Sequence, residues 1–237
     1  YLSNKIAILS FLLTVFIVIL HANMAMFCTG WISFIQHTIT AEVTRIAVPM
    51  FYLISGFLFF INYNGTFGDY KRKLKTRTRS LLIPYIFFLL CGSCIMFIID
   101  GVYTLGSFCG IIKHGIMYYP PIFYLFWYLR DLYVMVLFSP LVYLMIKKMP
   151  ILLFLPFLLW VFDKEPFVFP LNEAMFFFPL GAFFSKYTNR LEKTNHKSVW
   201  IYFCLWFLSC FFYDYMKENG LNPPYITHCA IILLGIY

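Results

Sequence analysis

Charged side chains are scarce in this chain of 237 residues. Only 12% of the residues are Asp, Glu, Lys or Arg, whereas about a quarter is usual in a soluble domain. Acidic residues are the rarer kind, 10 against 18 basic, and the formal net charge is +8. The basic residues stand in short clusters between long apolar runs, which indicates membrane topology rather than a nucleic-acid-binding face. We therefore expect neither a soluble globular domain nor a nucleic-acid partner.

Several motifs of soluble enzymes are missing as well. The sequence has no Gly-rich phosphate loop, no nucleophile elbow and no zinc motif, and His114 and His196 lack metal-ligand spacing. The 7 Cys are an odd number without the spacing of a secreted disulfide framework. No internal repeat and no low-complexity linker divides the chain. We expect a single transmembrane domain over residues 1–237, with no metal site.

Apolar residues are abundant instead. They make up 62% of the chain, and the aromatic ones include 30 Phe, 18 Tyr and 5 Trp. A bilayer accepts so much aromatic surface because lipid replaces water around the outward faces. A spanning helix needs ~20 largely apolar residues, and the sequence predicts an all-α, polytopic transmembrane helix bundle with about eight spans. The predicted spans are 6–27, 43–62, 81–99, 123–146, 150–163, 171–185, 198–216 and 224–237.

The positions of Lys and Arg give these spans a direction. If the N-terminus is cytoplasmic, the inner segments hold most of the 18 basic residues, including the cluster 71–79 and the pair 147–148. The outer loops then hold Lys113, Lys164 and Lys217. This alternation follows the positive-inside rule, so we predict a multi-pass protein with its N-terminus in the cytoplasm.

The outer stretch 100–122 has a helical pattern of its own. Its apolar residues recur at helical spacing, which predicts a short helix at the membrane interface. These residues are Ile111, Ile112, Ile116 and Tyr119.

His21 lies near the end of the first predicted span. A titratable side chain at membrane depth is costly and usually faces a cavity or a partner. A neutral imidazole accepts a proton from a hydroxyl group, which makes His21 a candidate general base. A histidine tied to a neighbouring helix by a hydrogen bond explains the position equally well.

The second span begins near Arg45 and contains Ser55 and Gly56. Arg45 is a candidate anion contact, although Glu42 lies three residues earlier, where the two can pair on one helical face. Pro49 and Gly56 interrupt helix regularity at mid-membrane, where the backbone needs other partners and a cavity can form. Alternatively, Ser55 and Gly56 permit close helix packing.

The basic stretch 70–80 precedes the third span. Arg72, Lys75 and Arg79 share one helical face. Such a run anchors the chain on anionic lipid, so membrane lipid is an expected partner. The cluster carries more charge than topology requires, and it suits the phosphates of a nucleotide such as coenzyme A.

Trp127, Arg130 and Asp131 open the fourth span. Adjacent helical residues point ~100° apart, so Arg130 and Asp131 are not expected to satisfy each other fully, and each should reach a partner on another helix. A structural ion pair and a role in a site near the outer surface are both compatible with this position.

Five segments together resemble the membrane acyltransferase 3 family of O-acyltransferases. They stand in the family's order and spacing and cover essentially the whole chain. The segments are FIVILH ending at His21, RIAVPMFYLISGFLFF (45–60), YKRKLKTRTRSLLIPY (70–85), FWYLRDLYVMVLFSPLVY (126–143) and FFPLGAFFS (177–185).

The resemblance implies transfer of an acyl group, most often acetyl, from cytoplasmic acyl-CoA to a carbohydrate hydroxyl. The expected acyl-CoA is acetyl-CoA. The acceptor would be a surface polysaccharide, lipopolysaccharide or peptidoglycan, and the membrane a bacterial-type inner membrane. His21 would be the general base, and the acyl donor would bind at Arg72, Lys75, Arg77 and Arg79. Arg45, Ser55, Trp127, Arg130 and Asp131 would support the site.

The chain also departs from the family pattern. Family members commonly carry an Arg eleven residues before the histidine, where this chain has Ser10. The resemblance implies a bundle of about ten helices, so the last ones would follow Tyr237. Because the sequence starts at Tyr1 and stops inside an apolar run, we expect it to be truncated at both ends. A transporter of a saccharide or small solute, or a catalytically impaired family member, remains an alternative.

Overall fold

The structure is a computed structural model that describes residues 2–22, 30–100, 105–117, 126–165, 170–187 and 196–236. Every element in these ranges is helical, which confirms the all-α fold class. The α-helices are α1 (Leu2–His21), α2 (Trp31–His37), α3 (Ala47–Phe60), α4 (Phe67–Arg77), α5 (Ile83–Asp100), α6 (Leu105–Met117), α7 (Trp127–Leu137), α8 (Ser139–Lys148), α9 (Phe154–Val161), α10 (Asn172–Phe184), α12 (His196–Glu218) and α13 (Tyr225–Ile236). Short 3-10 turns lie at η6 (Pro150–Leu153) and η7 (Ser185–Tyr187).

Within the described ranges, three helices are long and apolar enough to cross a membrane. They are Asn4–His21, Trp31–Phe60 and Phe67–Ile99, with 18, 30 and 33 residues. A fourth span results if α7 and α8, which meet at a bend of 57°, are one broken helix. The 12 residues of α13 extend only ~18 Å, against ~30 Å of hydrocarbon. Each of the eight predicted segments contains helix in its described part, but a count of eight spans is not confirmed.

The two longest helices change pitch just before a proline. Ahead of Pro49, η2 (Thr38–Val43) is π-helical and η3 (Thr44–Ile46) is a 3-10 turn. Ahead of Pro84, η4 (Thr78–Leu82) is again π-helical. Proline has no N–H and its ring clashes with the carbonyl four residues earlier, so the hydrogen-bond ladder shifts at that point.

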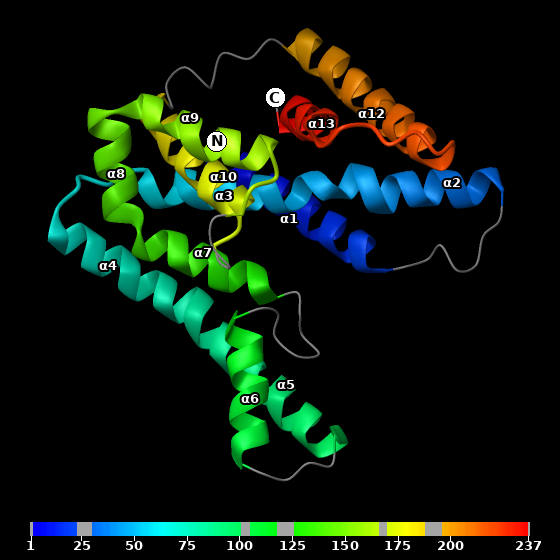
Figure 1. The fold of residues 1–237 in the computed structure, drawn as a ribbon. Helices are drawn as coiled ribbons and strands as arrows, with labels where there is room; N and C mark the ends of the chain where they lie inside the picture. Colours follow the sequence, from blue (N-terminus) through cyan, green and yellow to red (C-terminus); the bar gives the residue numbers. More distant parts are fainter. Residues whose placement is uncertain are drawn as a thin grey trace.

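Helices α3 and α10 lie side by side at the centre of the bundle (Figure 1). A Cβ atom at Gly56 would overlap the backbone carbonyl of Phe178, and one at Gly181 would overlap that of Leu53. Small residues allow two helix backbones to approach this closely. The predicted helix break at Gly56 is therefore wrong, because α3 runs unbroken through it, and the packing interpretation is correct.

Aromatic rings fill the core around this helix pair. Trp160 is fully buried and stacks on Phe176, with 5.5 Å between ring centroids. A second ring contact of Trp160, with Phe177, is T-shaped at 4.9 Å. On the α3 side, Phe59 and Phe60 pack against Phe178. Each such pair adds about 0.5–1.5 kcal/mol beyond area burial, so part of the unusual Phe content stabilises the interior.

Other apolar side chains face outward. Phe11 on α1, Phe87 on α5 and Leu208 on α12 are all more than half exposed. In water such faces would be an aggregation hazard, whereas in a bilayer they contact lipid. The distribution agrees with a membrane protein.

Helices α5 and α6 form an antiparallel hairpin that extends away from the other helices (Figure 1). The Tyr85 hydroxyl donates to the Gly115 carbonyl at 3.2 Å, and the rings of Phe97 and Phe108 are in contact. Helix α6 is the short helix predicted within 100–122, and it includes Ile111, Ile112 and Ile116. Tyr119 lies outside the described residues.

Polar contacts join helices near their ends. They are Glu42–Lys217, Asp131–Leu171, Lys73–Ile61 and Lys186–Ile146.

Candidate active site

Helix α4 carries the basic cluster, and its start is well defined. The Thr66 side chain accepts a hydrogen bond from the Asp69 backbone N–H at 3.2 Å, which caps the first turn. Asp69 places a negative charge at the helix N-terminus, and the basic residues follow toward the C-terminus, as the helix dipole favours.

One face of α4 and the following η4 turn forms an open groove. Its lining consists of Arg72, Lys75, Thr76, Arg79 and Ser80. Two guanidinium groups, an ammonium group and two hydroxyl groups are thus close together on one surface. All can donate hydrogen bonds to phosphate oxygens, and arginine does so with two parallel bonds. The groove brings together three of the four residues expected to bind the acyl donor.

Arg77, the fourth, points elsewhere. It is half-buried, and its charge acts on the hydroxyl group of Tyr128 in α7. Lys73, one turn earlier, donates to the backbone carbonyls of Phe59 and Ile61, the latter at 2.8 Å. A lysine at a helix C-terminus satisfies carbonyls that have no partner within the helix. This second face of α4 therefore joins the basic helix to the end of α3.

Tyr128 links α7 to the middle of α3. Its ring lies 4.7 Å from the ring of Tyr52, and Ser55 is a hydrogen-bonding neighbour of its hydroxyl group. Trp127, the first residue of α7, is half-buried. Ser55 and Arg77 are candidate site residues from two separate segments of the sequence. In the fold both lie near the same tyrosine.

Arg130 and Asp131 are buried in α7 and pair with each other. Arg130 Nε donates to Asp131 Oδ1 at 2.8 Å. The long arginine side chain thus spans the ~100° that separates adjacent residues around a helix. Each also has the predicted partner elsewhere: Arg130 donates to the Ile116 carbonyl at 2.8 Å, and Asp131 accepts from the Leu171 N–H at 3.0 Å. Together they fasten α6, α7 and the start of α10.

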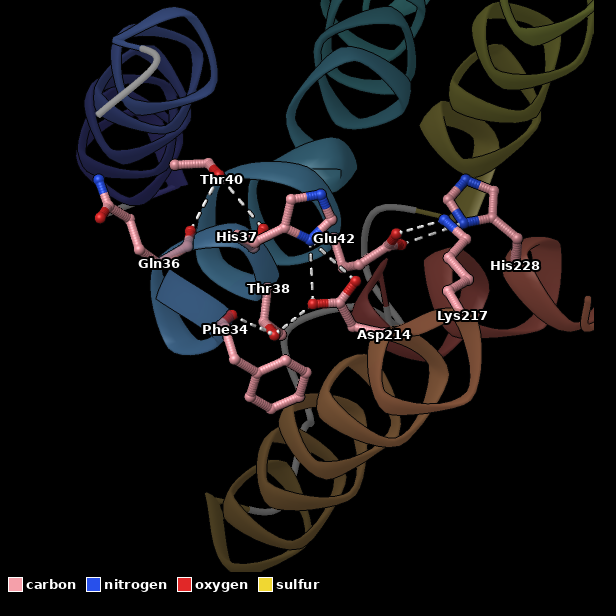
Figure 2. A network of polar contacts seen from close by, with 9 residues as sticks. All are labelled: Phe34, Gln36, His37, Thr38, Thr40, Glu42, Asp214, Lys217 and His228. Carbon is pink, nitrogen blue, oxygen red and sulfur yellow. Dashed lines mark hydrogen bonds and ion pairs between the residues drawn. The ribbon is translucent and has the colours of Figure 1, made fainter. Parts of the chain in front are cut away.

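Glu42 pairs with a different residue from the one expected. Its carboxylate is buried and accepts a hydrogen bond from Lys217 of α12 at 2.8 Å, with His228 of α13 at 3.5 Å (Figure 2). The predicted local pair with Arg45 is thus replaced by contacts far along the chain. Arg45 itself is exposed on η3.

His37 and Asp214 form a second contact in the same network (Figure 2). His37 Nδ1 lies 3.0 Å from Asp214 Oδ1, and the Thr38 hydroxyl donates to Asp214 Oδ2 at 2.6 Å. The Asp214 side chain is fully buried, whereas that of His37 is half exposed. A buried carboxylate that orients an exposed imidazole is the arrangement found where histidine acts as a base.

Neither His37 nor Asp214 was predicted from the sequence. Asp214 interrupts the apolar run of α12, and this interruption was a signal that could have identified it.

His21 is the last residue of α1 and is exposed. Ser10 lies eleven residues earlier. Because eleven residues make about three helical turns, Ser10 and His21 lie on nearly the same face of α1. Among the described residues, no three of His, Cys, Asp and Glu are close enough to hold a metal ion.

A small pocket lies between α3, α8, α10 and η7. Its polar lining includes Tyr63, which follows α3, Tyr143 of α8 and Lys186 of η7. Burial, followed by the charge of nearby Lys147, lowers the pKa of Lys186. Lys186 donates to the Ile146 carbonyl at 2.9 Å, so its first role is to cap α8.

Comparison with known families identifies the chain. The family model described as Acyltransferase domain (Acyl_transf_3) matches residues 6–237. Neither curated proteins nor solved structures give a match. The family match extends over nearly all of the sequence, including both the basic helix α4 and the network of Figure 2. The chain therefore belongs to acyltransferase family 3 and is a membrane acyltransferase.

Proposed function

We propose that this membrane acyltransferase takes an acyl group, most often acetyl, from cytoplasmic acyl-CoA. The observation that carries the proposal is the groove of α4, in which Arg72, Lys75 and Arg79 meet two hydroxyl side chains. Coenzyme A carries a diphosphate and a further phosphate group, and a cluster of guanidinium and ammonium groups complements such charge. An anchor on anionic lipid uses the same charges but needs no groove.

Binding of acetyl-CoA to the purified protein tests this assignment. We expect Lys75→Glu to weaken binding at least tenfold, because the variant replaces an attractive charge in the groove with a repulsive one. Lys71→Glu is the matched control: Lys71 is exposed on the same helix but does not line the groove. Equal weakening in both variants would show a diffuse electrostatic effect and refute the site.

The acceptor in this proposal is a carbohydrate hydroxyl on a surface or exported glycan. A base removes the hydroxyl proton while the oxygen attacks the thioester carbonyl, and the C–S bond then breaks. The coenzyme A thiolate leaves and takes a proton, and the acyl group stays on the sugar oxygen as an ester. By the orientation of the basic residues, the donor groove is cytoplasmic in a bacterial-type inner membrane.

Two histidines are candidates for the base. His21 occupies the position that the family resemblance marks, and it is our first choice. His37 is favoured by one specific observation, its hydrogen bond to the buried Asp214. Acetyl transfer by His21→Ala and His37→Ala separates them, because loss of the base lowers the rate of transfer without weakening acetyl-CoA binding.

The same measurements discriminate the alternatives. A transporter would bind no acetyl-CoA and form no ester. An impaired enzyme, as Ser10 in place of the family's arginine suggests, would bind acetyl-CoA without transfer. Ser10→Arg would then restore activity, whereas in an active enzyme it would change little.

A further inference from the structure

An open groove lies between α2 and the end of α12, apart from the basic groove of α4. Its walls are Gly30, Trp31 and Phe34 on one side and Tyr215, Glu218 and Asn219 on the other. Its volume of about 360 Å³ falls within the roughly 300–1,000 Å³ of small-molecule sites. The groove is large enough for a ligand and open enough to admit part of a chain.

The walls combine two kinds of chemistry. Trp31 is 76% exposed and Tyr215 is 52% exposed, so broad ring surfaces are available. Glu218 offers carboxylate oxygens, and Asn219, whose Nδ2 donates to the Tyr215 carbonyl at 2.7 Å, keeps its side-chain oxygen as an acceptor. A sugar ring presents C–H groups on its faces and hydroxyl groups around its rim. Aromatic rings beside a carboxylate and an amide match both features.

From this match, and on the basis of the proposed function, we propose that the groove binds the saccharide acceptor. The ring faces of Trp31 and Tyr215 would stack on a pyranose ring, while Glu218 and Asn219 would accept hydrogen bonds from its hydroxyl groups. Trp and Tyr also mark the lipid–water boundary in membrane proteins, but that role requires no concave surface and no acidic side chain beside them.

The groove is held open by local structure. Helix α12 ends in two hydrogen bonds, from Gly220 N–H to the Lys217 carbonyl and from Leu221 N–H to that of Met216, with Gly220 at a positive φ of 74°. This helix end fixes the position of Asn219. On the other wall, Phe34 is held between Trp31 and Phe211 by edge contacts of 6.1 Å. The binding surface is therefore largely preformed.

The two walls come from segments about 180 residues apart, and the network of Figure 2 joins them. Thr38, one turn after Phe34, donates to Asp214, the residue before Tyr215. The Glu42–Lys217 pair makes a second connection next to Glu218. These buried contacts would lock the relative position of the rings, which lowers the cost of ordering them when a ligand binds.

Saccharide binding by the full chain in lipid nanodiscs tests the proposal. The probes are soluble tetrasaccharides of N-acetylglucosamine, glucose, galactose and mannose. We expect saturable binding of at least one, weakened roughly tenfold by Trp31→Ala or Tyr215→Ala, as the loss of one stacked ring predicts. Trp200→Ala is the matched control, because Trp200 is 70% exposed on α12 but lies outside the groove. That variant should bind the saccharide as the unchanged protein does.

Acetyl-CoA binding is measured in the same samples, so that the two proposals can fail separately. If acetyl-CoA binds but no tetrasaccharide does, the groove proposal is overturned and the donor assignment stands. If Trp31→Ala and Trp200→Ala bind saccharide equally, the rings are interface anchors only and the groove proposal is again overturned. If acetyl-CoA does not bind at all, the proposed function fails, whatever the saccharides do.

Discussion

Replacing Gly56 by alanine should destabilise the protein, although alanine is the better helix former. The substitution adds one methyl group at the point where α3 touches α10. There, a Cβ atom would overlap the carbonyl oxygen and carbonyl carbon of Phe178 and lie tightly against its Cα. All three are backbone atoms, so none can rotate out of the way, and the two helices must move apart.

The size of the effect follows from two opposing terms. Overpacking of this kind costs about 1–3 kcal/mol, and a rigid obstacle favours the upper part of that range. Alanine in place of glycine inside a helix stabilises the helix by roughly 0.5–1 kcal/mol. We therefore expect a net loss of about 1–2 kcal/mol in the free energy of unfolding, measured by thermal or denaturant unfolding in detergent.

Gly110→Ala supplies a control in which the packing term is absent. Gly110 lies inside α6, and nothing is within 4 Å of the position that its Cβ would take. Only the helix-propensity term remains, so this variant should be more stable by up to about 1 kcal/mol. If Gly56→Ala and Gly110→Ala shifted stability in the same direction by the same amount, the close contact between α3 and α10 would be refuted.

Two further predictions concern the network of Figure 2. Lys217→Met leaves the buried Glu42 carboxylate, whose side chain is 1% exposed, without its ammonium partner. We expect this variant to lose ~2 kcal/mol in the free energy of unfolding. Adding Glu42→Gln should recover most of that loss, because the unpaired charge is then removed. A double variant no more stable than the single one would contradict the pairing. Thr38→Val removes a 2.6 Å hydrogen bond to the buried Asp214 carboxylate, which should cost about 1.5–3 kcal/mol. Thr40→Val, which loses a bond to the backbone of its own helix, should cost less than about 1 kcal/mol, and equal losses in the two variants would count against the Asp214 contact.

The positions of the helices could be predicted from the sequence because they depend on local information. Apolar run length marks α1 and the apolar part of the helix that contains α5, and the helical spacing of Ile111, Ile112 and Ile116 marks α6. The shared face of Arg72, Lys75 and Arg79 also follows from helix periodicity, and these residues line one groove. In each case the pattern and its consequence lie within a few turns of chain.

Partners far apart in the sequence could not be predicted in this way. Glu42 had a suitable local partner in Arg45, and i,i+3 spacing made that pair plausible. In the fold, Glu42 is buried in the π-helical turn η2, and Lys217 reaches it from 175 residues away. The same holds for Thr38 and Asp214, whose contact depends on how η2 packs against α12. A polar residue in an apolar run, such as Asp214, can be noticed in the sequence, but its partner is decided by helix packing and has no local signal.

The proposed donor and acceptor sites lie at opposite ends of one helix. Trp31 begins the 30-residue segment that ends at Phe60, which corresponds to ~45 Å of helix. Lys73 of the basic helix contacts the carbonyl of Phe59 near one end, and the saccharide groove opens at the other. If both proposals hold, the acyl group enters the bundle before it meets a sugar hydroxyl. Ser55 and Tyr128 are polar and lie nearer to the donor end of this segment, and the charge of Arg77 in α4 acts on the Tyr128 hydroxyl group. Polar groups at this point would lower the cost of moving a thioester carbonyl through an apolar interior. In the proposed mechanism the two faces of α4 would therefore differ in role: one would hold the phosphates of the donor, and the other would face the route of the acyl group.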